Sequence, residues 1–146
     1  MKIYIGSDHA GFELKGKILP FLKDLGYEVD DKGPFEYNKD DDYPDFIKPV
    51  AQAVSKEPES RGLVMGKSGQ GEAMRANRVR GVRTAVFYGG NQEVVKLSRE
   101  HNDANNLSLA AGFMSEAEAL AAVKLWLETP FSRDERHIRR IQKLDA

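Results

Sequence analysis

The sequence contains no cysteine, which excludes disulfides, cysteine-ligated zinc, iron–sulfur clusters and thiol nucleophiles. It also lacks an excess of one charge, because 22 Lys and Arg stand against 23 Asp and Glu, for a net charge of -1. Non-specific nucleic-acid binding depends on a basic excess and is not expected. No apolar run approaches the roughly 20 residues that cross a bilayer, and the first residues turn polar too early for a signal peptide. We expect a cytoplasmic protein that binds neither membranes nor nucleic acid.

Short apolar runs alternate along the chain with longer segments of helical period. The expected strands are residues 2–5, 27–30, 62–66, 84–88 and 106–111. The expected helices are residues 12–25, a helix starting at Pro44, residues 72–77, residues 92–100, a helix opened by a Ser115–Glu118 capping box, and a basic C-terminal helix at about 133–145. This α/β alternation predicts one domain over residues 1–146, with helices on both faces of a five-stranded parallel sheet. In such folds, ligands bind beyond the carboxyl ends of the strands.

A glycine-rich loop, Gly66–Glu72, follows the third expected strand and is the strongest local feature. Its glycines let the backbone approach a ligand, and amides at the start of a helix favour negative charge. The loop would therefore suit a phosphate or an oxyanion that develops on a carbonyl. It has neither the order of a P-loop nor that of a dinucleotide fingerprint, which disfavours a dinucleotide-dependent enzyme. The alternative is an ordinary tight turn with Glu72 in the first turn of the next helix.

Two polar pairs lie near other ends of expected elements. Asp8 and His9 follow the first strand, at the same edge of the sheet as the glycine-rich loop; alternatively, they are an N-cap aspartate and a surface histidine. His101 and Asn102 end a helix that returns to the opposite edge, so we expect His101 to lie far from the loop of its own chain. His101 is then either a helix C-terminal residue without a further role or a residue that serves a neighbouring subunit.

Charged residues cluster in two further places. Arg136 and Arg140 share one face of the C-terminal helix and would suit a phosphate, although a solvated face is the usual reason for such a cluster. The run Asp40–Asp42 could hold a cation but is more typical of a solvated loop. The three histidines, at positions 9, 101 and 137, have no metal-ligand spacing. We therefore expect no metal.

Six segments carry a resemblance to a known family: residues 6–11, 42–45, 66–72, 76–77, 99–102 and 136–140. In this order, and over nearly the whole chain, they resemble the ribose-5-phosphate isomerase B family, which also includes galactose-6-phosphate isomerase subunits. The resemblance implies a Rossmann-like three-layer αβα sandwich and an aldose–ketose isomerase that uses neither metal nor cofactor. It also implies a homodimer, sometimes paired into tetramers, with an active site shared between subunits. His101 would then complete the site of the partner.

The resemblance also implies the chemistry. In one branch of the family the catalytic base is a cysteine at the position of Gly66. The chain is similar to the other branch, which uses a glutamate, here Glu72, as the base that moves a proton through a cis-enediol intermediate. His101 would assist opening of the sugar ring, with Asp8 and Asn102 orienting hydroxyl groups. Ser68 and the neighbouring loop amides would stabilise the developing oxyanion. The implied substrate-binding residues are His9, Tyr43, Gly66, Lys67, Gly69, Gly71, Asn102, Arg136 and Arg140.

Two positions depart from the family pattern. Gly112 stands where the family has an arginine that binds the substrate phosphate, and Lys67 stands where the glutamate branch usually has glycine. We expect conversion of ribose 5-phosphate to ribulose 5-phosphate, as part of carbohydrate metabolism. A tetrose, a hexose or an unphosphorylated sugar is the first alternative, because of Gly112. The second is a non-catalytic module that binds sugar phosphates, which would not need both Glu72 and His101.

Overall fold

The computed structural model describes residues 1–146, which form one five-stranded parallel sheet with helices packed around it. The strands are β1 (Lys2–Ser7), β2 (Glu28–Asp31), β3 (Arg61–Gly66), β4 (Thr84–Phe87) and β5 (Asn106–Ala110). The helices are a 3-10 turn η1 (His9–Gly11), α1 (Phe12–Asp24), α2 (Tyr43–Lys56), α3 (Gln70–Ala76), α4 (Glu93–Glu100), α5 (Glu116–Glu128) and α6 (Glu135–Leu144). The predicted α/β class is confirmed.

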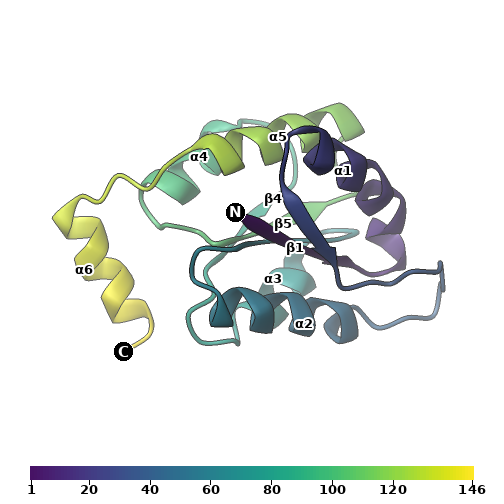
Figure 1. Ribbon diagram of the computed structural model, residues 1–146, viewed down its shortest axis with the longest axis horizontal. Coiled ribbons are helices and arrows are strands. Elements are labelled where there is room, and N and C mark those ends of the chain that lie inside the picture. The colour runs from purple at the N-terminus through teal and green to yellow at the C-terminus, as the bar shows by residue number, and fades with distance from the viewer.

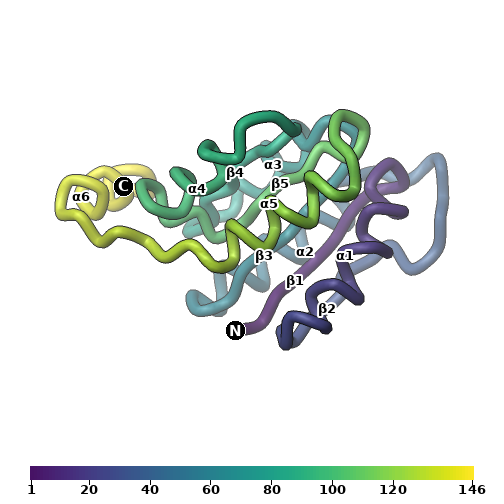
Figure 2. The backbone as a smooth tube through the Cα atoms, turned by 90° about the horizontal axis from the view of Figure 1, so that it is seen from above, coloured from purple at the N-terminus to yellow at the C-terminus, as the bar shows by residue number.

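Two helical layers enclose the sheet, as Figure 1 shows. Helices α1, α4 and α5 cover one face, and α2 and α3 cover the other. The view in Figure 2 shows the sheet from above, with α6 extending beyond its β4 side. This arrangement is the expected Rossmann-like three-layer sandwich. No helix combines the length and apolar character that spanning a membrane would require.

The strand order β2-β1-β3-β5-β4 determines where a ligand would bind. The chain leaves β1 towards β2 on one side and then crosses back to β3 on the other side, so the order reverses between β1 and β3. Open parallel sheets bind ligands at such a switch point, beyond the carboxyl ends of the two strands. In this chain those ends are Ser7 and Gly66, and Ser7 pairs with Met65 in the register. The glycine-rich loop and the Asp8–His9 pair therefore begin at the switch point.

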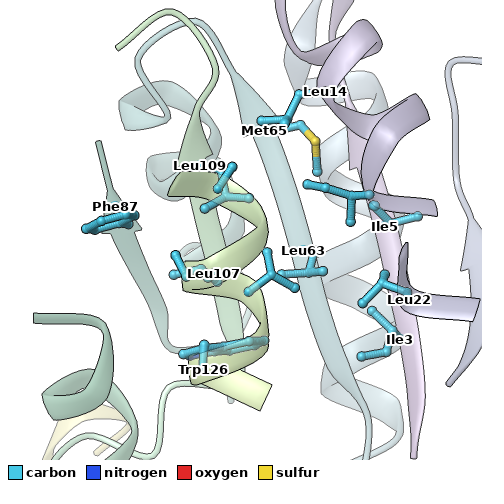
Figure 3. Packing of buried hydrophobic residues seen from close by; sticks show 14 of the residues in the cluster. Ile3, Ile5, Leu14, Leu22, Leu63, Met65, Phe87, Leu107, Leu109 and Trp126 are labelled. Atoms are coloured by element: carbon cyan, nitrogen blue, oxygen red, sulfur yellow. The ribbon is translucent and has the colours of Figure 1, made fainter. Parts of the chain in front are cut away.

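Strand β3 is buried on both faces, which explains why its sequence is a continuous apolar run and not an alternation of apolar and polar residues. Leu63 and Met65 belong to the larger hydrophobic cluster, between the sheet and helices α1, α4 and α5, which Figure 3 shows together with the fully buried Trp126. Val64 belongs to the smaller cluster, on the α2 and α3 side of the sheet. A parallel strand buried on both faces needs an apolar side chain in every direction. The continuous run at residues 62–66 therefore predicted β3 to within one residue.

Local end signals were also predicted correctly. Helix α1 ends in a Schellman motif, with Gly26 at φ 91°, where the N–H of Tyr27 donates to Leu22 O and the N–H of Gly26 donates to Lys23 O. The capping box of Ser115 and Glu118 opens α5. The expected bounds of the other helices and strands differ from the observed ones by no more than two residues, because the ends of such elements fray.

Candidate active site

The carboxyl ends of β1 and β3 bring two of the candidate segments together. The N–H of Asp8 donates to Met65 O at 3.4 Å, which joins the start of η1 to the end of β3. The Asp8 carboxylate is only 8% exposed and caps η1 by accepting the N–H of Gly11 at 3.1 Å. Gly11 also lies against Met65, where a Cβ would collide with the backbone of β3. The close approach fixes Asp8 beside the glycine-rich loop.

The Glu72 side chain folds back over Gly66. Glu72 is 4% exposed, and a Cβ placed on Gly66 would overlap its carboxylate oxygen Oε1. Burial raises the pKa of Glu72, its own backbone N–H opposes that shift, and the nearby Asp8 carboxylate adds to it. The result is a buried carboxylate held at the switch point and poised to accept a proton at a pH above the usual glutamate range.

The glycine-rich loop presents a group of backbone N–H donors. The amides of residues 67–69 and of Gly71 donate to no acceptor within the chain. Gly69 adopts φ 73°, and its carbonyl accepts the Ser108 hydroxyl at 2.7 Å, which anchors the loop to β5. Ser68 Oγ accepts only a long 3.4 Å bond from the N–H of Gln70, so its own proton remains free to be donated. Such preorganised donors suit negative charge on an oxygen.

Tyr43 closes one side of this loop. It is the first residue of α2, and its ring lies so close to Gly71 that a Cβ there would come within 2.7 Å of the ring carbon Cζ. The sequence placed Tyr43 at the site only by resemblance, and the structure places it against the loop. The contact also explains why a glycine is needed at position 71.

Lys67 occupies the space above Gly112. A Cβ added to Gly112 would lie 2.9 Å from Lys67 Cγ, and the N–H of Gly112 donates to Lys67 O at 2.9 Å. The glycine therefore leaves room for the lysine, which is exposed and forms no ion pair within the chain. The two departures from the family pattern are neighbours in space and together keep a positive charge at this edge of the sheet.

His9 pairs with Asp41, a residue that the sequence did not single out. Asp41 Oδ1 accepts the His9 backbone N–H at 3.0 Å and lies 2.6 Å from His9 Nδ1. The expectation of a solvated Asp40–Asp42 loop is wrong for Asp41, whose side chain is 6% exposed. The side chains of Asp8, His9 and Asp41 each offer one atom that could coordinate a metal, and these atoms lie within 4.8 Å of one another. The 2.6 Å contact, however, has the length of a charge-assisted hydrogen bond with a proton between its atoms.

The remaining candidate residues lie at the opposite edge of the sheet. His101 is the C-cap of α4, and the chain then enters β5 at Asn106, which pairs with Gly62 near the start of β3. Glu72 follows the other end of β3, which spans six residues. At about 3.3 Å per residue the strand alone separates the two groups by roughly 16 Å. His101 therefore lies far from Glu72 of the same chain. This separation agrees with the expectation from the sequence.

His101 lies in a basic cluster formed by α4 and α6. Its ring stacks on that of His137, with ring centroids 4.4 Å apart and an angle of 18° between the planes. Burial, followed by the neighbouring His101 and Arg136, lowers the pKa of His137, which disfavours a positive charge on the ring that stacks with His101. Arg136 and Arg140 are exposed on α6 next to this stack. Asn102 is exposed and lines a cavity of about 390 Å³ at this edge.

Comparison with known proteins identifies relatives over almost the full length. The family model described as Ribose/Galactose Isomerase matches residues 3–144. A protein of Mycolicibacterium paratuberculosis named ribose-5-phosphate isomerase B is 44% identical, with 99% of this chain and 89% of the relative covered. The ribose-5-phosphate isomerase B structure from Clostridium thermocellum superposes with a TM-score of 0.93 at 44% identity, over 99% of this chain and 95% of the other. That of Mycoplasma genitalium with bound ribulose-5-phosphate gives a TM-score of 0.93 at 37% identity, over 98% and 93%.

The fold and these relatives define the class of the protein as an aldose–ketose isomerase, an intramolecular oxidoreductase acting on sugar phosphates. The chain belongs to the ribose/galactose isomerase family, and the relatives described above are named ribose-5-phosphate isomerase B.

Proposed function

We propose that the chain interconverts ribose 5-phosphate and ribulose 5-phosphate through a cis-enediol intermediate, with Glu72 as the base. The observation that carries the proposal is the Glu72 carboxylate, buried over Gly66 beside four unpaired loop amides. The names of the relatives, and the ribulose-5-phosphate bound to the Mycoplasma genitalium protein, support the choice of sugar.

Glu72 transfers the proton, and the loop stabilises the charge that this transfer creates. Glu72 removes the proton from C2 of the open-chain aldose and returns it to C1, while the hydroxyl proton on O2 is lost and O1 gains one. Negative charge develops on oxygen during this step, where the amides of residues 67–69 and Gly71 and the Ser68 hydroxyl donate hydrogen bonds. Asp8, fixed beside Glu72 by its bond to Gly11, orients a sugar hydroxyl. Tyr43 encloses the sugar on the α2 side.

A second copy of the chain supplies the groups that lie at the other edge of the sheet. We propose a homodimer in the cytoplasm in which His101 of one copy assists ring opening at the Glu72 of the other, by moving a proton from a sugar hydroxyl to the ring oxygen. Asn102 accompanies His101, and Arg136 and Arg140 of the same copy bind the phosphate together with His9 of the first. In this arrangement the two edges, roughly 16 Å apart within one chain, contribute to two different active sites of the dimer. Pairing of dimers into tetramers stays a prediction.

Lys67 takes the place of the arginine that is missing at Gly112. Its side chain crosses Gly112 at the carboxyl edge and has no carboxylate partner to neutralise it. A lysine in this position acts as a mobile point charge, which binds a phosphate less directionally than an arginine fork does. The chain therefore keeps a cation for the substrate phosphate at this edge.

The Lys67→Met substitution is expected to raise the KM for ribose 5-phosphate by roughly 10–100-fold, the usual effect of losing a hydrogen bond to a charged group. The kcat should change little, because the lysine contacts the phosphate and not the reacting carbons. Steady-state kinetics with a phosphorylated and an unphosphorylated pentose measure the effect. Lys48→Met, at an exposed lysine on α2, is the matched control. An unchanged KM in Lys67→Met, or an equal rise for both sugars, would contradict the assignment.

The substrate is tested by offering the protein sugars in deuterated water and following isomerisation by NMR. Ribose 5-phosphate should be converted, with deuterium incorporated at the carbons flanking the enediol. Gly112 favours one second candidate, an isomerase of a tetrose, hexose or unphosphorylated sugar, so these are included. If only one of these other sugars is converted, that sugar is the substrate of the isomerase, and Gly112 is a determinant of its specificity. Turnover of none would refute the proposed reaction.

A further inference from the structure

The pair formed by His9 and Asp41 carries an inference about how the phosphate is held, and this inference rests on the proposed function. Both hydrogen bonds from His9, one from the backbone and one from the ring, go to the same oxygen, Asp41 Oδ1, at 3.0 and 2.6 Å. Two bonds to one atom fix both the position of the residue and the rotation of its ring. Because the carboxylate only accepts, Nδ1 carries a proton, and Nε2 is the free ring nitrogen.

The burial of Asp41 argues against a role in solubility. Its side chain is 6% exposed within a run of three aspartates, and its second oxygen, Oδ2, is buried without any hydrogen-bond partner. A buried carboxylate that lacks one of its partners is costly unless a positive charge lies beside it. The only basic group that contacts Asp41 is the His9 ring. The His9 ring is therefore the group that, when it is protonated, would supply a positive charge to this carboxylate.

Anchoring of the loop does not by itself explain the pair, because other contacts already hold residues 33–42. The buried Lys15 donates from Nζ to Pro34 O and to Asp31, both at 2.7 Å. Further along the loop, the ring of Tyr37 packs edge-on against that of Phe12, with centroids 6.1 Å apart. Asp41 lies beyond both anchors, where its position is set by His9.

We propose that Asp41 is a positioning residue that holds the His9 imidazole charged, with Nε2–H directed at the phosphate of the substrate. His9 then donates a charge-assisted hydrogen bond to a phosphate oxygen. Without the carboxylate, a neutral His9 could turn a lone pair on Nε2 towards the phosphate and repel it.

The charges around His9 support this state. The hydrogen bond to Asp41 raises the pKa of His9, burial opposes the shift, and the carboxylates of Asp8, Asp41 and Asp40 add to it. The Tyr37 ring also faces His9, with ring centroids 6.4 Å apart and an angle of 86° between the planes. A raised pKa keeps the imidazolium present to a higher pH than in a free histidine, and it is lost as the pH rises through that value. The KM for a phosphorylated sugar should therefore rise on the alkaline side, and do so later than for an unpaired histidine.

The test compares Asp41→Asn with Asp42→Asn in the full-length enzyme. Asp42 is the exposed neighbour, whose side chain makes no capping bond. In Asp41→Asn we expect the KM for ribose 5-phosphate and the inhibition constant of inorganic phosphate to rise roughly tenfold at neutral pH. The kcat should stay within about twofold, because His9 does not contact the reacting carbons. The alkaline rise in KM should also move to lower pH, while Asp42→Asn should match the parent.

Nitrogen NMR of His9 separates this inference from the proposed reaction. In the unsubstituted protein the ring should titrate at a raised pKa and hold its proton on Nδ1 when neutral, and Asp41→Asn should lower that pKa. The signals of the unsubstituted protein depend neither on turnover nor on the variant, so they test the pair even if no sugar is isomerised or Asp41→Asn fails to fold. A His9 with an ordinary pKa and a mixed tautomer, or an Asp41→Asn enzyme with an unchanged pH profile, would overturn the proposal.

Discussion

Replacing Glu72 with glutamine is expected to lower kcat for isomerisation by about 10²–10⁴-fold, the usual contribution of a positioned general base. Glutamine has nearly the same shape, so it should occupy the space over Gly66 and leave the loop intact, but it cannot accept the C2 proton. The KM should change little, because the phosphate and hydroxyl contacts remain. Turnover and deuterium exchange at C2, followed by NMR, measure both the reaction and its first step.

The pH dependence gives this prediction a second readout. Because burial and the Asp8 carboxylate raise the pKa of Glu72, the base is protonated, and therefore inactive, up to a pH above the usual glutamate range. The acid limb of kcat/KM should accordingly lie above that range in the unsubstituted enzyme. Glu116→Gln removes an exposed first-turn glutamate from α5 and is the matched control. A Glu72→Gln enzyme that retains deuterium exchange would assign the proton transfer to another group.

Gly66 and the proposed base Glu72 compete for the same space. The resemblance implies a cysteine at position 66 in the other branch, and here the Glu72 carboxylate lies where the Cβ of that residue would be. The two bases would occupy the same volume, so one chain holds only one of them. Gly66 is therefore part of the site through the space that it leaves to the glutamate.

The parts of the fold that could be predicted depend on residues close together in the sequence. The apolar run that became β3, the Schellman end of α1 and the capping box of α5 each involve six or fewer consecutive residues. The placement of Glu72 beside Asp8 followed from topology alone, because every strand of a parallel sheet ends at the same edge. The same rule placed His101 at the opposite edge.

The parts that could not be predicted are contacts between distant residues. Asp41 meets His9 across 32 positions, and in the sequence it looks like its solvated neighbours. Lys67 reaches Gly112 from another strand end, so two separate departures from the family pattern became one feature only in three dimensions. The sequence linked them only chemically, through a lost arginine and a gained lysine in loops at the same edge of the sheet, and could not place the lysine side chain.

A mixed dimer of one Glu72→Gln chain and one His101→Asn chain is expected to recover about half of the activity of the unsubstituted dimer. Each variant alone should be nearly inactive, since every site of its dimer lacks one group. In the mixed dimer, a site that takes Glu72 from one copy and His101 from the other is intact, while its symmetry mate lacks both. The physical basis is the length of β3, which keeps the two residues of one chain roughly 16 Å apart.

Two different affinity tags and purification through both isolate the mixed dimer, and the isomerase assay measures its activity per dimer. Doubly tagged dimers of each single variant are the controls, because tagging alone should restore nothing. A mixed dimer as inactive as its parents would mean that each site takes both groups from one chain, or that one of them has no part in the reaction. Recovery of about half the activity has no explanation within a single chain, because every chain in the mixture carries a substitution.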